Sequence, residues 1–202
     1  IAALALGGLA WAVHNSILEL DGNVVIDNPP DEDWIQIYCD FNPGDPDCMG
    51  IPASTAIVSG FFTDPVNSDM DDIFAGAKDS LDINAGVPQD WGWQLGTSND
   101  KNDIEHGFVA LYQDPDDGHY KLYFGADKLA NNGDAAMGFW FLQNDVTKVG
   151  DGSFSAGHEI GDLLVQTDFT NGGDVSRIDA YVWVGGSTKA EVEANCAAWP
   201  NS

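Results

Sequence analysis

Closely spaced carboxylates are the residues of this chain best suited to chemistry, because several hard oxygens together can hold Ca²⁺. Glu19 and Asp21 are two apart in a predicted strand, so both side chains share one face of it. Asp179 lies in the last predicted strand, and the three could supply part of an oxygen shell. The alternative is a solvated edge strand that uses its charge to prevent aggregation.

A second acidic cluster lies in a predicted loop. Its members are Asp100, Asn102, Asp103 and Glu105. Asp100 and Asn102 match the start of an EF-hand loop, but Glu105 and Leu111 stand where that loop needs a glycine and a glutamate. The cluster is therefore not an EF-hand. A loop Ca²⁺ site is one interpretation, and a turn whose side chains bond their own backbone is the other.

Aromatic and amide side chains offer a different chemistry, the binding of sugars. Trp91 and Trp93 are two apart and share a strand face, where paired indoles could stack on pyranose rings. The alternative for them is core packing, because a domain of this size needs large apolar anchors. Asn131, Asn132 and Asp134 could bond sugar hydroxyls or simply hold a tight loop.

The sequence gives weaker evidence for a catalytic site than for ion or sugar binding. His106 directly follows Glu105 and His158 directly precedes Glu159, and a glycosidase needs two carboxylates about 5–9 Å apart. So acidic a chain offers many such pairs and singles out none. The sequence contains no nucleophile elbow, zinc-protease motif or phosphate loop. We therefore name no catalytic residue.

The sequence predicts short strands separated by clusters of Gly, Asn, Asp and Pro, and these strands would position the candidate site residues. The predicted strands cover 17–26, 34–41, 56–62, 91–95, 107–113, 120–125, 136–143, 162–169 and 177–184. We expect a helical turn near 70–77, a hairpin turn at 114–118, and a helix over 189–197 capped by Ser187 or Thr188. This pattern predicts an all-β, antiparallel two-sheet β-sandwich of jelly-roll (concanavalin-like) type with at most short helices. The expected domain covers 14–186, and 187–202 form a short helix or linker.

The charge balance limits the partners. The chain has 202 residues, with 33 acidic against 7 basic side chains and a net charge of −26. Such a surface repels phosphate backbones and anionic lipid, which excludes nucleic acid and anionic membrane surfaces as partners. Cations are the natural partners, while solubility in a salty medium is the alternative explanation.

Three cysteines indicate the redox compartment. Cys39 and Cys48 enclose a loop of turn-forming residues, so a disulfide between them is geometrically easy and suits an oxidising compartment. Zinc is a poor alternative, because no second Cys or His pair lies at ligand spacing. Cys196 could pair with another segment, pair between molecules, or be buried and inert.

The apolar segment 1–13 has the length of a signal-peptide core and contains an A-x-A cleavage signal at residues 10–12. We read it as a signal-peptide remnant, with Val13 or His14 as the mature start. The alternatives are a donor strand that enters a neighbouring subunit and a membrane anchor.

Five motifs carry a family resemblance. They are ELDGN (19–23), DKNDIEHGF (100–108), LYFGADKLANNGDAAMGFWF (122–141), GSFSAGHEIGDLLV (152–165) and DFTNGG (168–173). In this order they resemble a family of secreted or surface-displayed bacterial proteins, over residues 17–184. The resemblance implies a jelly-roll-like domain outside the cell, often followed by repeat or anchoring regions. It implies location and fold better than activity, because the function of that family is poorly defined.

Three functions are compatible with these features. The first is a non-catalytic, secreted or cell-surface module with a structural, adhesive or glycan-binding role, stabilised by Ca²⁺. The second is a self-assembling filament subunit that uses 1–13 as a donor strand and therefore binds copies of itself. The third is a glycoside hydrolase or lyase of concanavalin-like fold.

Overall fold

The computed structural model describes residues 17–20, 23–27, 29–66, 69–76, 82–83, 90–150, 152–171 and 174–199. The predictions for segment 1–13 and for Asp21 lie outside these residues. The chain forms two compact units. The first comprises Ile1–Asp64 and His106–Asp127, and the second comprises Pro65–Glu105 and Lys128–Ser202.

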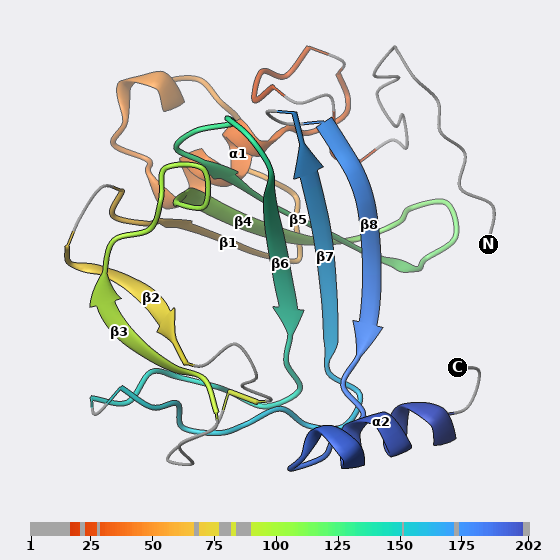
Figure 1. Cartoon of the computed structure of the whole chain (residues 1–202). Helices are drawn as coiled ribbons and strands as arrows, with labels where there is room; N and C mark the ends of the chain where they lie inside the picture. Colours follow the sequence, from red (N-terminus) through yellow and green to blue (C-terminus); the bar gives the residue numbers. More distant parts are fainter. Residues whose placement is uncertain are drawn as a thin grey trace. The chain divides into compact units, whose positions relative to one another are not determined.

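The first unit is built on an antiparallel sheet with the strand order β1-β4-β5 (Figure 1). Its strands are β1 (Val58–Thr63), β4 (Ile104–Gln113) and β5 (Tyr120–Lys128). In the register of β1 and β4, Phe61 lies opposite Phe108 and Thr63 lies opposite His106. The helix α1 (Trp34–Phe41) packs against β1 and is followed by the short 3-10 helix η1 (Pro46–Cys48).

The turn between β4 and β5 has the predicted hairpin chemistry. The N–H of Asp114 donates to the carbonyl of His119, and the N–H of Gly118 donates to the carbonyl of Asp114. Gly118 has a φ of +73°, a left-handed conformation that glycine adopts at little cost. The Asp114 carboxylate also pairs with Lys121. Turn residues 114–118 are therefore confirmed.

A small apolar core and a buried carboxylate hold the first unit together. The core consists of Ile17, Leu18, Ile37, Ala110 and Tyr112. Beside it, the buried Glu32 accepts hydrogen bonds from Ser54 Oγ at 2.7 Å, Thr55 N at 2.8 Å and the Tyr112 hydroxyl at 2.9 Å. Since each donor is satisfied by one carboxylate, Glu32 ties the 54–55 loop to β4.

The second unit contains two antiparallel sheets (Figure 1). One pairs β2 (Asp71–Ala75) with β3 (Gly92–Gly96). The other has the order β6-β7-β8, formed by β6 (Ala135–Phe141), β7 (Leu163–Thr170) and β8 (Asp174–Val182). The helix α2 (Lys189–Ala198) follows β8, and Thr188 is its N-cap, as predicted.

Three sequence predictions of secondary structure are wrong. Residues 34–41 form α1 and not a strand, because Asp33 and Gln36 make a reciprocal capping box at its start. In the described part of 17–26 the backbone forms only an isolated bridge, from Leu18 to Glu32. Residues 71–75 are strand β2 and not a helical turn, because β3 pairs with them along their whole length.

The remaining strands were predicted within a few residues, and the structure confirms an all-β fold of antiparallel sheets. Its α-helices in the described residues are α1 and α2, of 8 and 10 residues. No helix within those residues is long and apolar enough to cross a membrane.

The predicted disulfide joins Cys39 and Cys48. Cys196 is a free thiol and exposed, so of its three alternatives the buried, inert one does not apply.

Candidate functional site

The first unit contains an aromatic pocket of about 270 Å³. It lies just below the roughly 300–1,000 Å³ that is usual for small-molecule sites. Its lining combines four aromatic rings, two aliphatic side chains, one imidazole and two carboxylates. These residues are Trp34, Tyr38, Phe61, Phe108, Val24, Ile35, His106, Asp47 and Asp127. We call this site the aromatic pocket.

The helix α1 presents two of the rings from one face, because Trp34 and Tyr38 are four residues apart. Trp34 lies 4.4 Å from Phe108 between ring centroids, and Tyr38 meets Phe61 edge-on at 5.2 Å. Each contact joins the helix to the β1-β4-β5 sheet. The four rings thus hold one another at the separations that aromatic pairs prefer.

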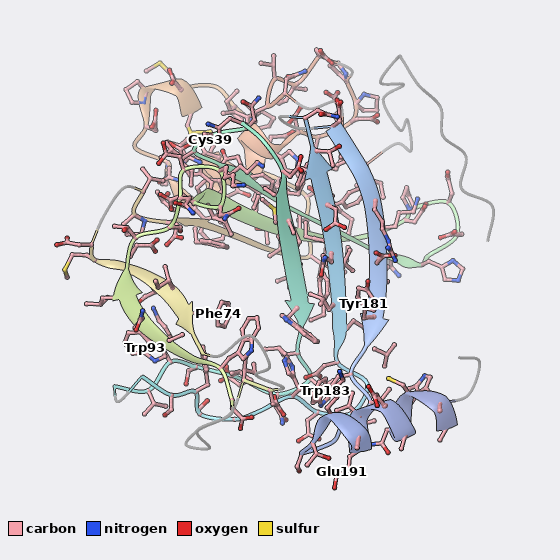
Figure 2. The ribbon with its side chains drawn as sticks, in the orientation of Figure 1. Cys39, Phe74, Trp93, Tyr181, Trp183 and Glu191 are labelled. Atoms are coloured by element: carbon pink, nitrogen blue, oxygen red, sulfur yellow. A yellow bond between two sulfur atoms is a disulfide. The ribbon has the colours of Figure 1, made fainter. Side chains whose placement is uncertain are left out.

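The disulfide fixes the end of α1 and the loop that carries Asp47. Figure 2 shows Cys39 on α1, and its partner Cys48 belongs to η1. Within this loop the Tyr38 hydroxyl donates to Asp45 Oδ2 at 2.7 Å. That hydrogen bond lowers the pKa of Asp45 and raises the pKa of Tyr38. The loop therefore keeps a carboxylate beside the rings, and the Tyr38 oxygen is already engaged.

The polar wall of the pocket is a histidine held by an aspartate of the neighbouring strand. His106 Nδ1 lies 2.9 Å from Asp127 Oδ2, and the His106 backbone N–H donates to Asp127 Oδ1 at 2.7 Å. The imidazole also lies 5.5 Å from the Phe61 ring. Because Nδ1 is engaged by the carboxylate, Nε2 is the ring nitrogen left to meet a ligand. The Asp127 side chain is 52% exposed, so it can accept further hydrogen bonds.

Gly125 in β5 leaves room for the ring of Phe108. A Cβ atom on Gly125 would lie 2.6 Å from the Phe108 ring, closer than real contacts allow. The bare backbone at this position lets the ring lie against β5 and line the pocket. Gly125 is therefore required for the position of Phe108, although it does not itself line the pocket.

The residues predicted to hold Ca²⁺ on the first strand are placed as follows. Glu19 is buried in the first unit, and its carboxylate accepts from the Asp27 N–H at 3.4 Å. Asp179 belongs to β8 of the second unit, where it pairs with Arg177 and accepts from the Tyr181 hydroxyl at 3.2 Å. Both carboxylates thus have protein partners, and their role as ligands stays a prediction.

The second acidic cluster occupies a turn of the second unit. The backbone carbonyls of Asp100 and Asp103 accept from the N–H groups of Ala130 and Leu129, at 3.0 and 2.9 Å. Asp103 is buried, and Asp71, from the start of β2, is buried beside it. Burial first, and repulsion from Asp103 second, raise the pKa of Asp71.

The other three members of that cluster are not buried. Asp100 and Asn102 are exposed, and Glu105 is half-buried in β4. The cluster is therefore divided between surface and interior, and its binding of Ca²⁺ also stays a prediction.

The paired tryptophans of the second unit each have a packing partner. The indole N–H of Trp93 donates to the carbonyls of Val149 and Ser153, at 3.0 and 2.9 Å. Trp91 meets Phe74 edge-on at 5.4 Å. Figure 2 labels Trp93 and Phe74 on the two paired strands β3 and β2. These contacts show that both indoles contribute to packing, and sugar stacking on them stays a prediction.

The polar connection before β6 carries the remaining predicted ligands. Asn131 and Asn132 are exposed. Asp134 Oδ1 accepts from the Asn171 N–H at 3.3 Å, and the Asp134 carbonyl accepts from Lys101 Nζ at 2.6 Å. Asp134 therefore holds the loop. A contact of Asn131 or Asn132 with sugar stays a prediction.

The second histidine that the sequence singled out is part of the packing of its unit. The His158 ring lies 4.0 Å from Trp140 and 5.3 Å from Trp183, and its side chain is 3% exposed. Its Nδ1 lies 3.3 Å from Asp162. Burial alone would raise the pKa of Asp162, but the N–H donors of Gln143 and Glu159 lower it overall. So enclosed an imidazole has a structural role.

Sequence reasoning missed most of the aromatic pocket. It considered His106 but assigned no role to Trp34, Tyr38, Phe61 or Phe108. One signal was available: Asp33 and Gln36 have the spacing of a capping box, directly before an apolar run. A helix over 34–41 would have placed Trp34 and Tyr38 on one face.

Comparisons of the chain with protein-family models, with curated proteins and with solved structures gave no match. The resemblance carried by the five motifs therefore stays a prediction.

Proposed function

We propose that the protein is a secreted, non-catalytic β-sheet module that binds a neutral glycan in the aromatic pocket. The observation that carries the proposal is the convergence of four aromatic rings and two carboxylates on one pocket of about 270 Å³. Ring faces stack on the apolar faces of sugars, and carboxylates accept hydrogen bonds from hydroxyls. The pocket volume suits one sugar ring of a chain and not a long stretch of it.

The charge selects among glycans. Asp47 and Asp127 face the pocket, and the whole chain has a net charge of −26. Both would repel a sulfated or uronic sugar, so a neutral hexose is the favoured ligand.

The Cys39–Cys48 disulfide supports location in an oxidising compartment. The finer fold proposal, a two-sheet jelly roll, rests on the antiparallel sheets and on the motif resemblance.

A glycan array followed by titration calorimetry tests the proposal. Neutral glycans should bind, and Asp127→Asn and Tyr38→Ala should weaken that binding at least tenfold. Trp91→Ala is the matched control, since it removes an aromatic ring from the alternative platform in the second unit. Binding lost in Trp91→Ala but kept in Asp127→Asn would transfer the site to that platform. An array without any hit would remove the proposal.

The His106–Asp127 pair favours a second candidate, a glycoside hydrolase or lyase. A carboxylate that fixes one imidazole nitrogen leaves the other to act as a general base or acid. Incubation with β-glucans and other polysaccharides should then release reducing ends, and His106→Gln should abolish the release. Binding without release assigns the pocket to recognition alone.

Two further proposals rest on the sequence. One is the filament subunit, for which negative-stain microscopy should show fibres that disappear on deletion of residues 1–13. The other is stabilisation by Ca²⁺ at the acidic clusters. A ligand of the native state raises the melting temperature, so a melting curve unchanged by EDTA would remove that proposal.

A further inference from the structure

A second pocket, within the second unit, has a cationic lining in a strongly acidic chain. Its volume is about 110 Å³, and Lys101, Asn102, Lys128, Met137 and Phe169 are among its lining residues. A cavity of about 10–15 Å³ already admits one water molecule, so this pocket can hold a group of several heavy atoms. We call it the lysine pocket.

The two lysines differ from the other described basic residues in their partners. Four of those residues form ion pairs with carboxylates: Lys121 with Asp114, Lys148 with Asp72, Arg177 with Asp179, and Lys189 with Glu193. Within the described part of the chain, Lys101 and Lys128 form no ion pair. With 33 acidic side chains available, pairing is the expected state. The two lysines without an ion pair, Lys101 and Lys128, line the same pocket.

The ammonium of Lys128 is the central observation. Its nitrogen is buried and has no hydrogen-bond acceptor among the described residues. It lies 4.7 Å from the centre of the Phe169 ring, a cation–π contact that leaves its N–H groups unsatisfied. A buried charge without an acceptor is costly, so an anion or water is expected to complete this site.

The backbone holds the second lysine at the pocket before any ligand arrives. Hydrogen bonds from Leu129 and Ala130 to the carbonyls of Asp103 and Asp100 join the turn before β4 to the chain after β5. Lys101 Nζ donates one hydrogen bond to the Asp134 carbonyl at 2.6 Å, which leaves two N–H groups for another acceptor. The site is therefore organised by several elements of one unit.

We propose that the lysine pocket binds the carboxylate group of a small molecule, between the ammonium groups of Lys128 and Lys101. A single negative charge fits the site better than a phosphate dianion, because the chain's net charge of −26 penalises every added negative charge. Met137 and Phe169 offer apolar walls for the carbon atoms next to the carboxylate. This site is separate in its residues and in its ligand class from the aromatic pocket.

Titration calorimetry on the full chain, at constant ionic strength, tests the proposal. The probes are sodium acetate, which presents the carboxylate alone, sodium glucuronate, which presents it on a sugar ring, and inorganic phosphate. We expect saturable binding of acetate or glucuronate, weakened at least tenfold in Lys128→Met, since a charge-assisted hydrogen bond is lost. Tighter binding of glucuronate than of acetate would identify a sugar acid as the source of the carboxylate.

Lys148→Met is the matched control. Lys148 lies in the same unit and is also near an aromatic ring, 5.3 Å from Trp93, but it pairs with Asp72. Its loss should change the affinity less than twofold. If Lys128→Met fails to fold, Lys101→Gln should still weaken binding while the circular dichroism spectrum is unchanged.

Three results would overturn the proposal. Absence of saturable binding of acetate and glucuronate would assign the pocket to water. Equal losses in Lys128→Met and Lys148→Met would show general electrostatics and no site. Phosphate binding more tightly than both carboxylates would refute the ligand class. None of these results bears on neutral glycan binding, because neither lysine lines the aromatic pocket.

Discussion

Replacing Cys39 and Cys48 together by alanine removes the cross-link between α1 and the loop of Asp47. The two cysteines are 9 residues apart in the sequence. In the chain-entropy account, closing a loop of that length in the unfolded state stabilises the protein by about 2.5 kcal/mol at 25 °C. At about 2–4 °C per kcal/mol for a chain of this size, the melting temperature should fall by roughly 5–10 °C.

Differential scanning calorimetry of the double variant measures this shift, and dithiothreitol should reproduce it in the wild type. Cys196→Ser is the control, because that thiol is exposed and free and its loss should leave the melting temperature unchanged. Glycan affinity should also fall, since the cross-link holds Tyr38 and Asp47 at the aromatic pocket. A shift below about 2 °C, or an equal shift in Cys196→Ser, would refute the reasoning.

Three further substitutions test other parts of the structure. Glu32→Gln should lower the free energy of unfolding, measured in urea, by about 1–3 kcal/mol, because an amide cannot replace the buried carboxylate acceptor. An unchanged urea midpoint would contradict this role of Glu32. Because the pKa of Asp71 is raised in the folded state, the stability of the wild type should fall as the pH rises above about 4. In Asp71→Asn the urea midpoint should therefore depend less on pH between pH 4 and 7. The same pH dependence in the variant and the wild type would contradict this role of Asp71. Thr188→Ala removes the acceptor of the Glu191 N–H and should destabilise α2 by about 1 kcal/mol, seen as faster amide exchange than in Ser187→Ala.

Local patterns predicted most of the strands that have one face more buried than the other, with β2 as an exception. In β6, the half-buried Met137, Phe139 and Phe141 alternate with more exposed neighbours, and that alternation is visible in the sequence. The predicted strands 120–125 and 136–143 are present as β5 and β6, but β5 and β6 belong to different sheets. Which strands pair depends on contacts far apart in the chain, and no local period contains that information.

The wrong predictions have the same origin. Ile35, Ile37 and Cys39 alternate with Gln36 and Tyr38, which imitates a strand. Residues 34–41 nevertheless form a helix, because its N-terminal capping box and its packing on β1 stabilise it. The alternation of apolar residues contains no information about either contact.

The pocket residues were missed for a similar reason. His106 and Phe108 come from β4, Phe61 from β1, and Trp34 from a helix read as a strand. Apart from Asp179, the predicted site residues were chosen because they are near one another in sequence, whereas the aromatic pocket collects rings from segments far apart. In contrast, the disulfide joins close neighbours in sequence, and its prediction is confirmed.

The first unit is made from two separate stretches of chain, and this determines the order in which it can form during synthesis. Val58 of β1 pairs with Leu111 of β4, so β1 has no partner until about 50 more residues have been made. At about 5–20 residues per second, that strand waits several seconds with an open edge. The loop closed by Cys39 and Cys48 needs no later residue and can close during that interval. Within the first unit the aromatic pocket is completed late, because His106, Phe108 and Asp127 arrive with the returning segment.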